Sequence, residues 1–415
     1  MRRTNTFKLS PTKEQEQKLF LLAENCARMF NEINYKRRQS LFSKNFDWNT
    51  DFFYHKYKKV IGSATAQQVT RKNNEAWKSF FALLRLKKQG KLPKHIRKVS
   101  PPGYWKDRKT GKRVLTILIR CNCYKLSDKR LKLPFNLEIN WKGQNKWKGK
   151  KQGRLEIRYD NLSKKWYAHM PVEVEKPPPL PPPLHQLKGD KKKKKKEAYV
   201  DLGVKVPIMV WVDGEVFGYK ANSMLSDWWY WNTEKIAKHQ EELKKKNNKH
   251  VSKRLKALYR KRKRRFRDKV NKIVKDFMEK CWAKGVSEIV CGDLRDIRKS
   301  ANFNKKSNSM IHNFWSVGHV YKRLKEKAEE YGIKTVRIDE RGTSSTCPRC
   351  SSKKIMRHKR LFKCKECKLE AHRDAVGCVN IGNIRLAQED GNMFPAGVVN
   401  GAVARPSLAT LHSVA

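Results

Sequence analysis

Two pairs of cysteines constrain the fold of this chain more tightly than any other feature of its sequence. Cys347 and Cys350 form one C-x-x-C pair, Cys364 and Cys367 form a second, and a basic stretch separates them. Four thiolates at this spacing can enclose one tetrahedral Zn²⁺ with a two-stranded ribbon between the pairs. A redox dithiol needs only one pair, and a catalytic zinc needs an open coordination position, which four thiolates do not leave. The sequence therefore predicts a structural zinc ribbon over residues 343–368.

The other cysteines and the nearby histidines do not extend this pattern. His358 and His372 lie within or beside the predicted ribbon, where a bystander or a nucleic-acid contact is a better interpretation than zinc ligation. Reduced, buried thiols are the ordinary expectation for single cysteines in apolar or basic surroundings. Six cysteines are of this kind: Cys26, Cys121, Cys123, Cys281, Cys291 and Cys378.

The excess of basic residues indicates a polyanionic partner. The 415 residues include 97 Lys and Arg against 39 Asp and Glu, which gives a formal net charge of +58. A compact chain with this charge repels itself unless a polyanion neutralises it, and each phosphate that it neutralises releases condensed counterions. Nucleic acid is therefore the expected partner. The competing interpretations are ribosomal-type RNA binding and a basic protein of the membrane surface.

The sequence carries no pattern that is typical of export or of membrane insertion. Residues 1–9 include two arginines but lack the apolar core of a signal peptide. No window reaches the roughly 18 apolar residues that a membrane helix needs. We therefore expect no membrane partner and a cytoplasmic, nucleoid-associated protein with reduced thiols.

The pattern of apolar residues changes along the chain and divides it into segments. Residues 10–92 carry apolar side chains at three- and four-residue steps, which is typical of amphipathic helices. Residues 1–9 and 93–175 read as strands with basic turns between them, which indicates a small β-barrel or curled sheet. Strands then alternate with helices, which indicates an α/β multidomain protein with a mixed sheet flanked by helices. The remaining expected boundaries are a Pro/Lys-rich linker at 176–197, the α/β domain at 198–342 and 369–387, and a disordered tail at 388–415.

One long basic helical region is expected at about residues 228–284. It contains the run from Arg260 to Arg267, in which Phe266 is the one uncharged residue. Such a run could bind phosphate groups, and a merely solvated helix face is the competing interpretation.

Three carboxylates lie at the ends of predicted elements in this otherwise basic chain. Asp201 ends an apolar strand, Glu340 follows the strand expected at 335–338, and Asp374 opens the last helix. Two-metal hydrolysis of a phosphodiester needs acidic residues that converge from different strands and hold two ions about 4 Å apart. Carboxylates fit Mg²⁺, which prefers oxygen ligands. Each acid alone is commonly structural, so the hypothesis depends on the three together.

Several short motifs, taken in order, resemble a known family. They resemble the C-terminal half of TnpB proteins, transposon-encoded relatives of type V CRISPR effectors, and the start of the chain is similar to the start of TnpB. The motifs are Val200-Asp201-Leu202-Gly203, Cys291-Gly292-Asp293-Leu294, Thr343 to Cys350, Arg373-Asp374-Ala375 with Asn380-Ile381, and near the N-terminus Phe7-Lys8-Leu9 with Pro11 to Gln15 and Asn31.

The resemblance implies both an architecture and a set of partners. It implies a RuvC nuclease domain with an RNase H-like fold, a wedge-like β-barrel formed by 1–9 and 93–175, and a helical recognition lobe at 10–92. It also implies a guide RNA that pairs with one strand of a double-stranded DNA target, beside a short DNA motif. The implied cofactors are a structural Zn²⁺ and two Mg²⁺ ions, and a monomer is favoured.

One departure from the family pattern affects the active site. Many family members carry Glu directly before the Asp-Leu pair of the second RuvC strand, and here that position is Gly292. Some relatives supply the glutamate from just ahead of the Thr-Ser and zinc motif, where Glu340 stands. Our hypothesis is a triad of Asp201, Glu340 and Asp374. The alternatives are Asp293 as the middle ligand and a nuclease that has lost its activity.

The sequence therefore predicts an RNA-guided, Mg²⁺-dependent DNA endonuclease associated with a transposable element. A compact type V CRISPR effector and a nuclease-dead, RNA-guided DNA-binding repressor are the alternatives. A DNA-strand transposase is disfavoured, because no Tyr or Ser has the context of a strand-transfer nucleophile.

Overall fold

The computed structural model describes residues 1–43, 45–93, 96, 98–107, 111–175, 196–248, 250–294, 305–313, 315–390 and 410–413. The chain divides into two compact units, Met1–Glu175 and Lys176–Ala415. Most of the expected linker, residues 176–195, lies outside the described residues. No helix in the described ranges is long and apolar enough to cross a membrane.

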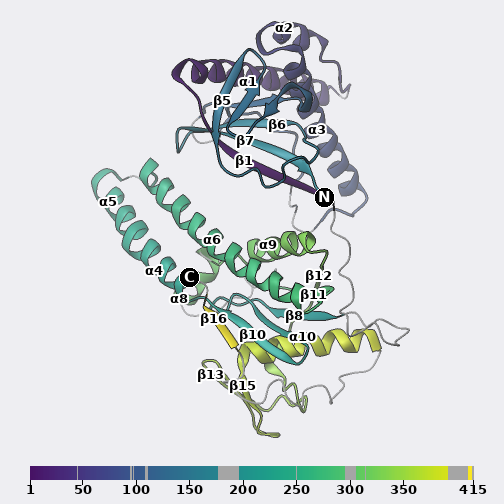
Figure 1. Cartoon of the computed structure of the whole chain (residues 1–415), viewed down its shortest axis with the longest axis vertical. Helices are drawn as coiled ribbons and strands as arrows, with labels where there is room; N and C mark the ends of the chain where they lie inside the picture. The colour runs from purple at the N-terminus through teal and green to yellow at the C-terminus, as the bar shows by residue number, and fades with distance from the viewer. Residues whose placement is uncertain are drawn as a thin grey trace. The chain divides into compact units, whose positions relative to one another are not determined.

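The first unit contains an antiparallel sheet whose hydrogen-bonded order is β2-β6-β7-β1-β5-β4-β3 (Figure 1). Strand β1 alternates in burial, with Asn5, Phe7 and Leu9 turned into the core. Closure of this sheet into a barrel stays a prediction. The strands are β1 (Arg2–Ser10), β2 (Thr116–Ile119), β3 (Lys125–Leu126), β4 (Arg130–Leu133), β5 (Leu137–Lys142), β6 (Leu155–Asp160) and β7 (Lys165–Glu173).

Three helices complete the first unit: α1 (Lys13–Phe42), α2 (Asp51–Ile61) and α3 (Ser63–Lys88). A capping box starts α1, because the Thr12 side chain accepts a hydrogen bond from the backbone N–H of Gln15 while the Gln15 side chain accepts from the backbone of Thr12. Helix α2 buries Phe53, Tyr57 and Ile61, which lie at four-residue steps.

The buried face of α3 that contains Trp77 also includes polar side chains. Asn73 accepts a hydrogen bond from the buried Arg37 at 2.7 Å, and Trp77 donates to Asn34 at 2.9 Å. These bonds offset the desolvation of the buried polar groups, so they fix how α3 docks on α1.

The second unit is built on a mixed sheet of order β12-β11-β8-β9-β10-β16. Strands β8, β9 and β10 form an antiparallel meander, and β11 runs parallel to both β8 and β12. The bounds are β8 (Glu197–Asp201), β9 (Met209–Val212), β10 (Glu215–Lys220), β11 (Glu288–Gly292), β12 (Lys334–Ile338) and β16 (Thr410–Ser413).

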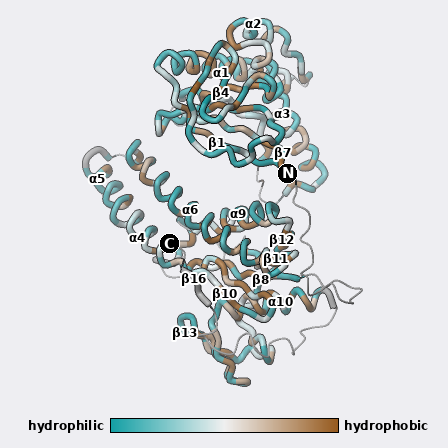
Figure 2. The backbone as a smooth tube through the Cα atoms, in the orientation of Figure 1, coloured by the Kyte–Doolittle hydropathy of each residue, from teal (hydrophilic) through white to brown (hydrophobic). Residues whose placement is uncertain are grey.

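Helices cover both faces of this sheet. Val200, Ile289 and Cys291 pack in one core with α6 (Lys253–Ala283) and α9 (Val317–Glu330). Tyr199 and Val290, on the opposite face, pack with α10 (Arg373–Asp390) and the zinc-ribbon segment. Figure 2 shows the hydrophobic residues concentrated in the central strands, whereas α5 (Lys238–Asn247) is hydrophilic.

The prediction of one continuous helical region at 228–284 is wrong, because the region is interrupted. It consists of the end of α4 (Asn222–Trp229), a π-helical segment (Tyr230–Ala237), α5 and α6. The break has two local causes. Asn248 ends α5 in the left-handed conformation with φ 45°, and Ser252 caps α6 by accepting from the N–H of Leu255. A further helix, α8 (Lys305–Asn313), was not predicted.

The expected disordered tail at 388–415 is wrong for two stretches. Helix α10 continues to Asp390, and Thr410–Ser413 forms β16, which pairs in parallel with β10. β10 would otherwise be the edge strand of this sheet, and the backbone of β16 pairs with it there.

The predicted zinc ribbon contains a small antiparallel sheet of β13 (Ile355–His358), β14 (Leu361–Cys364) and β15 (Glu370–His372). Phe362 on β14 is fully buried in the core that it shares with Ala375 and Val376 of α10. The ribbon is thereby packed against the helix that carries Asp374.

Candidate functional site

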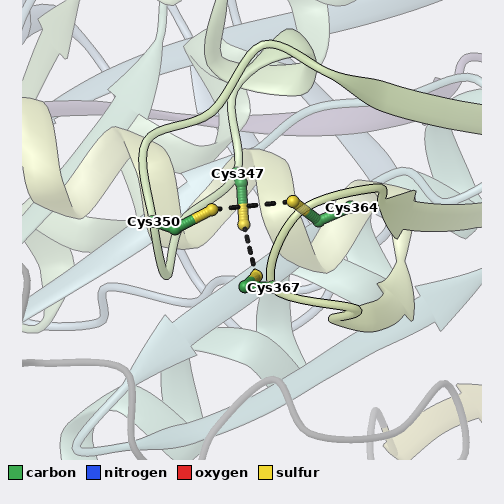
Figure 3. Close-up of side chains that lie close together, drawn as sticks. All are labelled: Cys347, Cys350, Cys364 and Cys367. Atoms are coloured by element: carbon green, nitrogen blue, oxygen red, sulfur yellow. Dashed lines mark hydrogen bonds between the residues drawn. The ribbon is translucent and has the colours of Figure 1, made fainter.

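The four predicted zinc ligands converge on one point (Figure 3). The Sγ atoms of Cys347 and Cys367 lie 3.5 Å apart, and those of Cys350 and Cys364 lie 3.6 Å apart. All four Sγ atoms lie within 4.8 Å of one another. Zn–S bonds of about 2.3 Å in a tetrahedron require separations of about 3.8 Å, so the site fits zinc.

The backbone around the second C-x-x-C pair favours the thiolate form of Cys364. Burial opposes ionisation of Cys364, but the backbone N–H groups of Glu366 and Cys367 and two thiol hydrogen bonds lower its pKa to about 7. Burial raises the pKa of Cys347 to about 12. A bound cation would hold both in the thiolate form, as structural zinc does.

Strand order brings the predicted acids to one edge of the sheet. Asp201 is the last residue of β8, and Glu340 lies two residues beyond the end of β12. Because β8, β11 and β12 are parallel, their carboxyl ends share that edge. Asp374 is the second residue of α10, which packs on the same sheet.

The Glu340 carboxylate fills the space that a side chain at Gly292 would need. A Cβ built on Gly292 would collide with Oε2 of Glu340 and lie 2.7 Å from its Cδ. The registry pairs Cys291 with Val200, so Gly292 and Asp201 are the next neighbours across β11 and β8. Strands lie about 4.8 Å apart, and residues in register on parallel strands point to the same face. The Glu340 carboxylate therefore lies over the strand next to Asp201, on the α10 face.

Helix α10 approaches Asp201 through a glycine. A Cβ at Gly377 would lie 2.6 Å from Oδ2 of Asp201, which is closer than side-chain atoms can come. Gly377 therefore lets the first turn of α10, with Asp374, come close to the end of β8.

Two residues of the Thr-Ser motif tie Glu340 to the same helix. Both the N–H and the hydroxyl of Thr343 donate to the carbonyl of Glu340, at 3.1 Å and 2.9 Å. The buried Asn380 of α10 donates to the carbonyls of Thr343 and Thr346, at 2.6 Å and 2.8 Å. The loop after β12 and the helix that carries Asp374 are thus one hydrogen-bonded assembly.

The acids are electrostatically coupled. Burial raises the pKa of Asp201 well above its usual range, and the charges of Asp374 and Glu340 raise it further. Burial raises the pKa of Glu340 to about 7, with added repulsion from Asp293 and Asp339. Oε2 of Glu340 is buried and has no hydrogen-bond partner among the described residues. A buried carboxylate oxygen without a donor, beside other acids, is a natural ligand for a divalent cation.

The three carboxylates are less tightly gathered than the four cysteine sulfur atoms. In the described part of the chain, the four cysteines are the one group of three or more His, Cys, Asp and Glu whose ligand atoms all lie within 4.8 Å. Asp374 is instead held by Arg360, whose Nη1 lies 2.7 Å and 2.8 Å from its two carboxylate oxygens. Asp293, the alternative ligand, follows β11 directly, and its N–H donates to the carbonyl of Ile338.

Sequence reasoning missed Arg360. It lies in the hairpin turn between β13 and β14, and no spacing distinguishes it from Arg357 or Lys359, which are also basic. Among the described residues, neither His358 nor His372 belongs to the cluster of possible zinc ligands. His372 accepts a hydrogen bond from the N–H of Asp374, and His358 is exposed.

The predicted basic run on α6 is largely exposed, although Lys261 also lies over the Trp231 ring, 5.0 Å from its centroid. Lys261, Lys263, Arg264 and Arg267 are exposed. Arg265 instead pairs with Asp227 at 3.0 Å. The neighbouring aromatics Trp229, Tyr230 and Tyr259 are 48%, 45% and 38% exposed. Exposed cations interleaved with aromatic rings can contact both phosphates and bases.

The sequence of this chain matches two family models and a known protein. Residues 318–381 match the family model described as Cas12f1-like, TNB domain, and residues 169–298 match one described as Probable transposase. A TnpB-like protein, ORF457 of Acidianus two-tailed virus, is 37% identical over 367 residues, covering 83% of this chain and 79% of that protein.

A solved structure shares the fold. A chain in the cryo-EM structure of a Cas12f1–sgRNA–target DNA complex superposes with a TM-score of 0.56 at 13% identity, covering 93% of this chain and 99% of that one. This likeness confirms the mixed α/β fold that the sequence predicted, and the four converging cysteines fit the predicted zinc ribbon.

Proposed function

Because the chain belongs to the TnpB family, we propose that it is an RNA-guided DNA endonuclease with a RuvC-type active site. The order of strands supports this assignment. An antiparallel meander, β8 to β10, is extended on the β8 side by two parallel strands, which is the arrangement expected of an RNase H-like domain. The family relationship also supports the association with a transposable element.

The observation that carries the proposal is the position of the Glu340 carboxylate over Gly292. β11 carries Gly292 where the family pattern has a glutamate, yet the Glu340 carboxylate occupies the space that a side chain at 292 would fill. Asp201 reaches the same edge from the adjacent strand, and Asp374 reaches it from α10. We assign Asp201, Glu340 and Asp374 as the ligands for Mg²⁺.

The residues of the chain have separable roles in this mechanism. Mg²⁺ ions bound to the three carboxylates would activate the attacking water and stabilise the leaving oxygen. Asp201 fixes the centre to the sheet, and Asn380 and Thr343 hold the Glu340 loop against α10. Glu340 must be ionised to bind a cation, so its raised pKa is expected to fall when the cation binds. Cleavage in this way leaves 3′-hydroxyl and 5′-phosphate ends.

The basic surface supports the proposed partners. A net charge of +58 suits a protein that binds the backbones of a guide RNA and of double-stranded DNA, with sequence read mainly by base pairing. We assign the exposed cations of α6 to phosphate contacts. The solved relative was determined as a complex with a guide RNA and target DNA, which supports the same pairing here.

The test uses the protein as it is purified with its RNA. Sequencing of the copurifying RNA identifies the guide, and a plasmid with a matching target is then incubated with the complex and Mg²⁺. We expect linear product from the wild type and none from Asp201→Asn, with equal target binding by both. Target binding without any cleavage by the wild type would instead establish a nuclease-dead, RNA-guided DNA-binding protein.

A further inference from the structure

Arg360 connects the zinc ribbon to the proposed nuclease centre. It stands in the turn between β13 and β14, four positions before the zinc ligand Cys364. Its Nη1 lies 2.7 Å from one carboxylate oxygen of Asp374 and 2.8 Å from the other. Its backbone carbonyl accepts the N–H of Arg373 at 2.8 Å. Both the side chain and the backbone of this turn are therefore attached to the start of α10.

The pair is sheltered on the side of the aspartate. The Asp374 side chain is 13% exposed, whereas that of Arg360 is 37% exposed. One nitrogen that contacts both oxygens of a carboxylate occupies the position from which a cation would be chelated. A divalent ion that bound Asp374 through either oxygen would have to share it with this guanidinium or displace it.

The ribbon fixes the backbone of the turn that carries Arg360. Phe362, two residues further on, is fully buried against α10, and Cys364 is buried within the cluster of thiolates. The turn therefore has little freedom to withdraw as a unit. The arginine side chain, being half-exposed, can rotate into solvent without moving the ribbon.

We propose that Arg360 is a positioning residue that acts as an internal counter-ion for Asp374 and competes with the divalent cation for its carboxylate. The proposal rests on the function assigned above, since it takes Asp374 to be a metal ligand. The competition follows from electrostatics. The guanidinium neutralises one of three neighbouring acids while no metal is bound, and its removal leaves those acids with more unbalanced negative charge.

The test measures metal binding and requires no cleavage. The full-length, zinc-loaded chain is titrated with Mn²⁺ in the absence of nucleic acid, and free Mn²⁺ is followed by electron paramagnetic resonance. We expect Arg360→Gln to bind Mn²⁺ more tightly than the wild type, on the order of two- to fivefold, as for the loss of a partly exposed ion pair. Arg360→Lys keeps the charge and should stay near the wild-type affinity.

Two controls separate the possible failures. Arg357→Gln changes another arginine of the same hairpin, one that contacts Ser345 rather than an acid, and should leave Mn²⁺ affinity unchanged. Asp374→Asn should weaken Mn²⁺ binding. Zinc content of one ion per chain in every variant would show that the ribbon is intact.

Each result decides the proposal. If Arg360→Gln binds Mn²⁺ no more tightly than the wild type while Asp374→Asn binds it weakly, Arg360 does not compete and this inference alone fails. If Asp374→Asn binds Mn²⁺ as the wild type does, the assigned metal site fails and the inference fails with it. If Arg360→Gln loses its zinc, the comparison of Arg360→Lys with Arg357→Gln decides: a large fall in affinity for Arg360→Lys alone would overturn a role based on charge.

Discussion

Substitution of Gly292 by alanine tests whether the Glu340 carboxylate truly belongs over β11. The new Cβ would collide with Oε2 of Glu340 and lie 2.7 Å from Cδ and 3.1 Å from Cβ of the same residue. Non-bonded carbon atoms prefer separations of about 3.5–4.0 Å, so the whole carboxylate must leave its position. Gly292 itself lies on a buried central strand with neighbours on both sides, so the strand cannot yield instead.

The magnitude follows from two separate effects. Overpacking at a buried site costs about 1–3 kcal/mol of stability. Loss of a residue that merely orients a metal ligand costs roughly 10- to 100-fold in metal affinity or activity, so displacement of a ligand should cost at least about 100-fold in cleavage rate. We therefore expect Gly292→Ala to cleave plasmid at least about 100-fold more slowly than wild type while it still binds target DNA.

A matched glycine provides the control. Gly318 on α9 has nothing within 4 Å of the position where its Cβ would be, so Gly318→Ala should cleave normally. The double variant Gly292→Glu with Glu340→Gly returns a carboxylate from the β11 backbone, and it should recover part of the lost cleavage. Normal cleavage by Gly292→Ala, with an unchanged melting temperature, would refute the placement of Glu340.

Three further predictions follow from the structure. Burial raises the pKa of Glu340 to about 7, so between pH 4.5 and 7 the folded state holds a proton that the unfolded state has released. In magnesium-free buffer, this one group should therefore lower the free energy of unfolding, measured in urea, by up to about 3 kcal/mol as the pH rises from 4.5 to 7. Glu340→Gln should flatten that decline, and an equally steep decline in the variant would contradict the assignment. Cys364→Ala should abolish the one zinc ion per chain measured by elemental analysis and lower the melting temperature, whereas Cys121→Ser, at an exposed cysteine outside the cluster, should change neither. Arg264→Gln on α6 should make the logarithmic salt dependence of DNA binding less steep by about 0.9, as for one lost phosphate contact, and Lys322→Gln on α9 should not; equal slopes for wild type and Arg264→Gln would leave α6 a solvated face.

The zinc site shows what spacing alone can predict. The residues within one C-x-x-C pair are close in the chain, so their geometry is set locally. Only the approach of the two pairs to each other requires the tertiary fold. The four sulfur atoms meet as the spacing indicated. The helices with regular apolar steps, α1 and α3, were predictable for the same reason, since their pattern is local.

Features that depend on tertiary contacts were not predictable. The role of Glu340 beside Gly292 was predictable only from the family resemblance, because the contact depends on the register of β12 on β11 and no local pattern encodes that register. Arg360 reaches Asp374 because the ribbon folds back on α10 through Phe362. The break at Asn248 illustrates the opposite error, because a strongly basic helical composition concealed a local left-handed cap.

The most direct measurement of the central claim compares two carboxylates that compete for the role of middle ligand. The RNA complexes of Glu340→Gln and Asp293→Asn are incubated with target plasmid and Mg²⁺, and cleavage is measured alongside target binding. With a triad of Asp201, Glu340 and Asp374, Glu340→Gln binds target without cutting it and Asp293→Asn retains cleavage. Cleavage at the wild-type rate by Glu340→Gln, together with its loss in Asp293→Asn, would contradict the account.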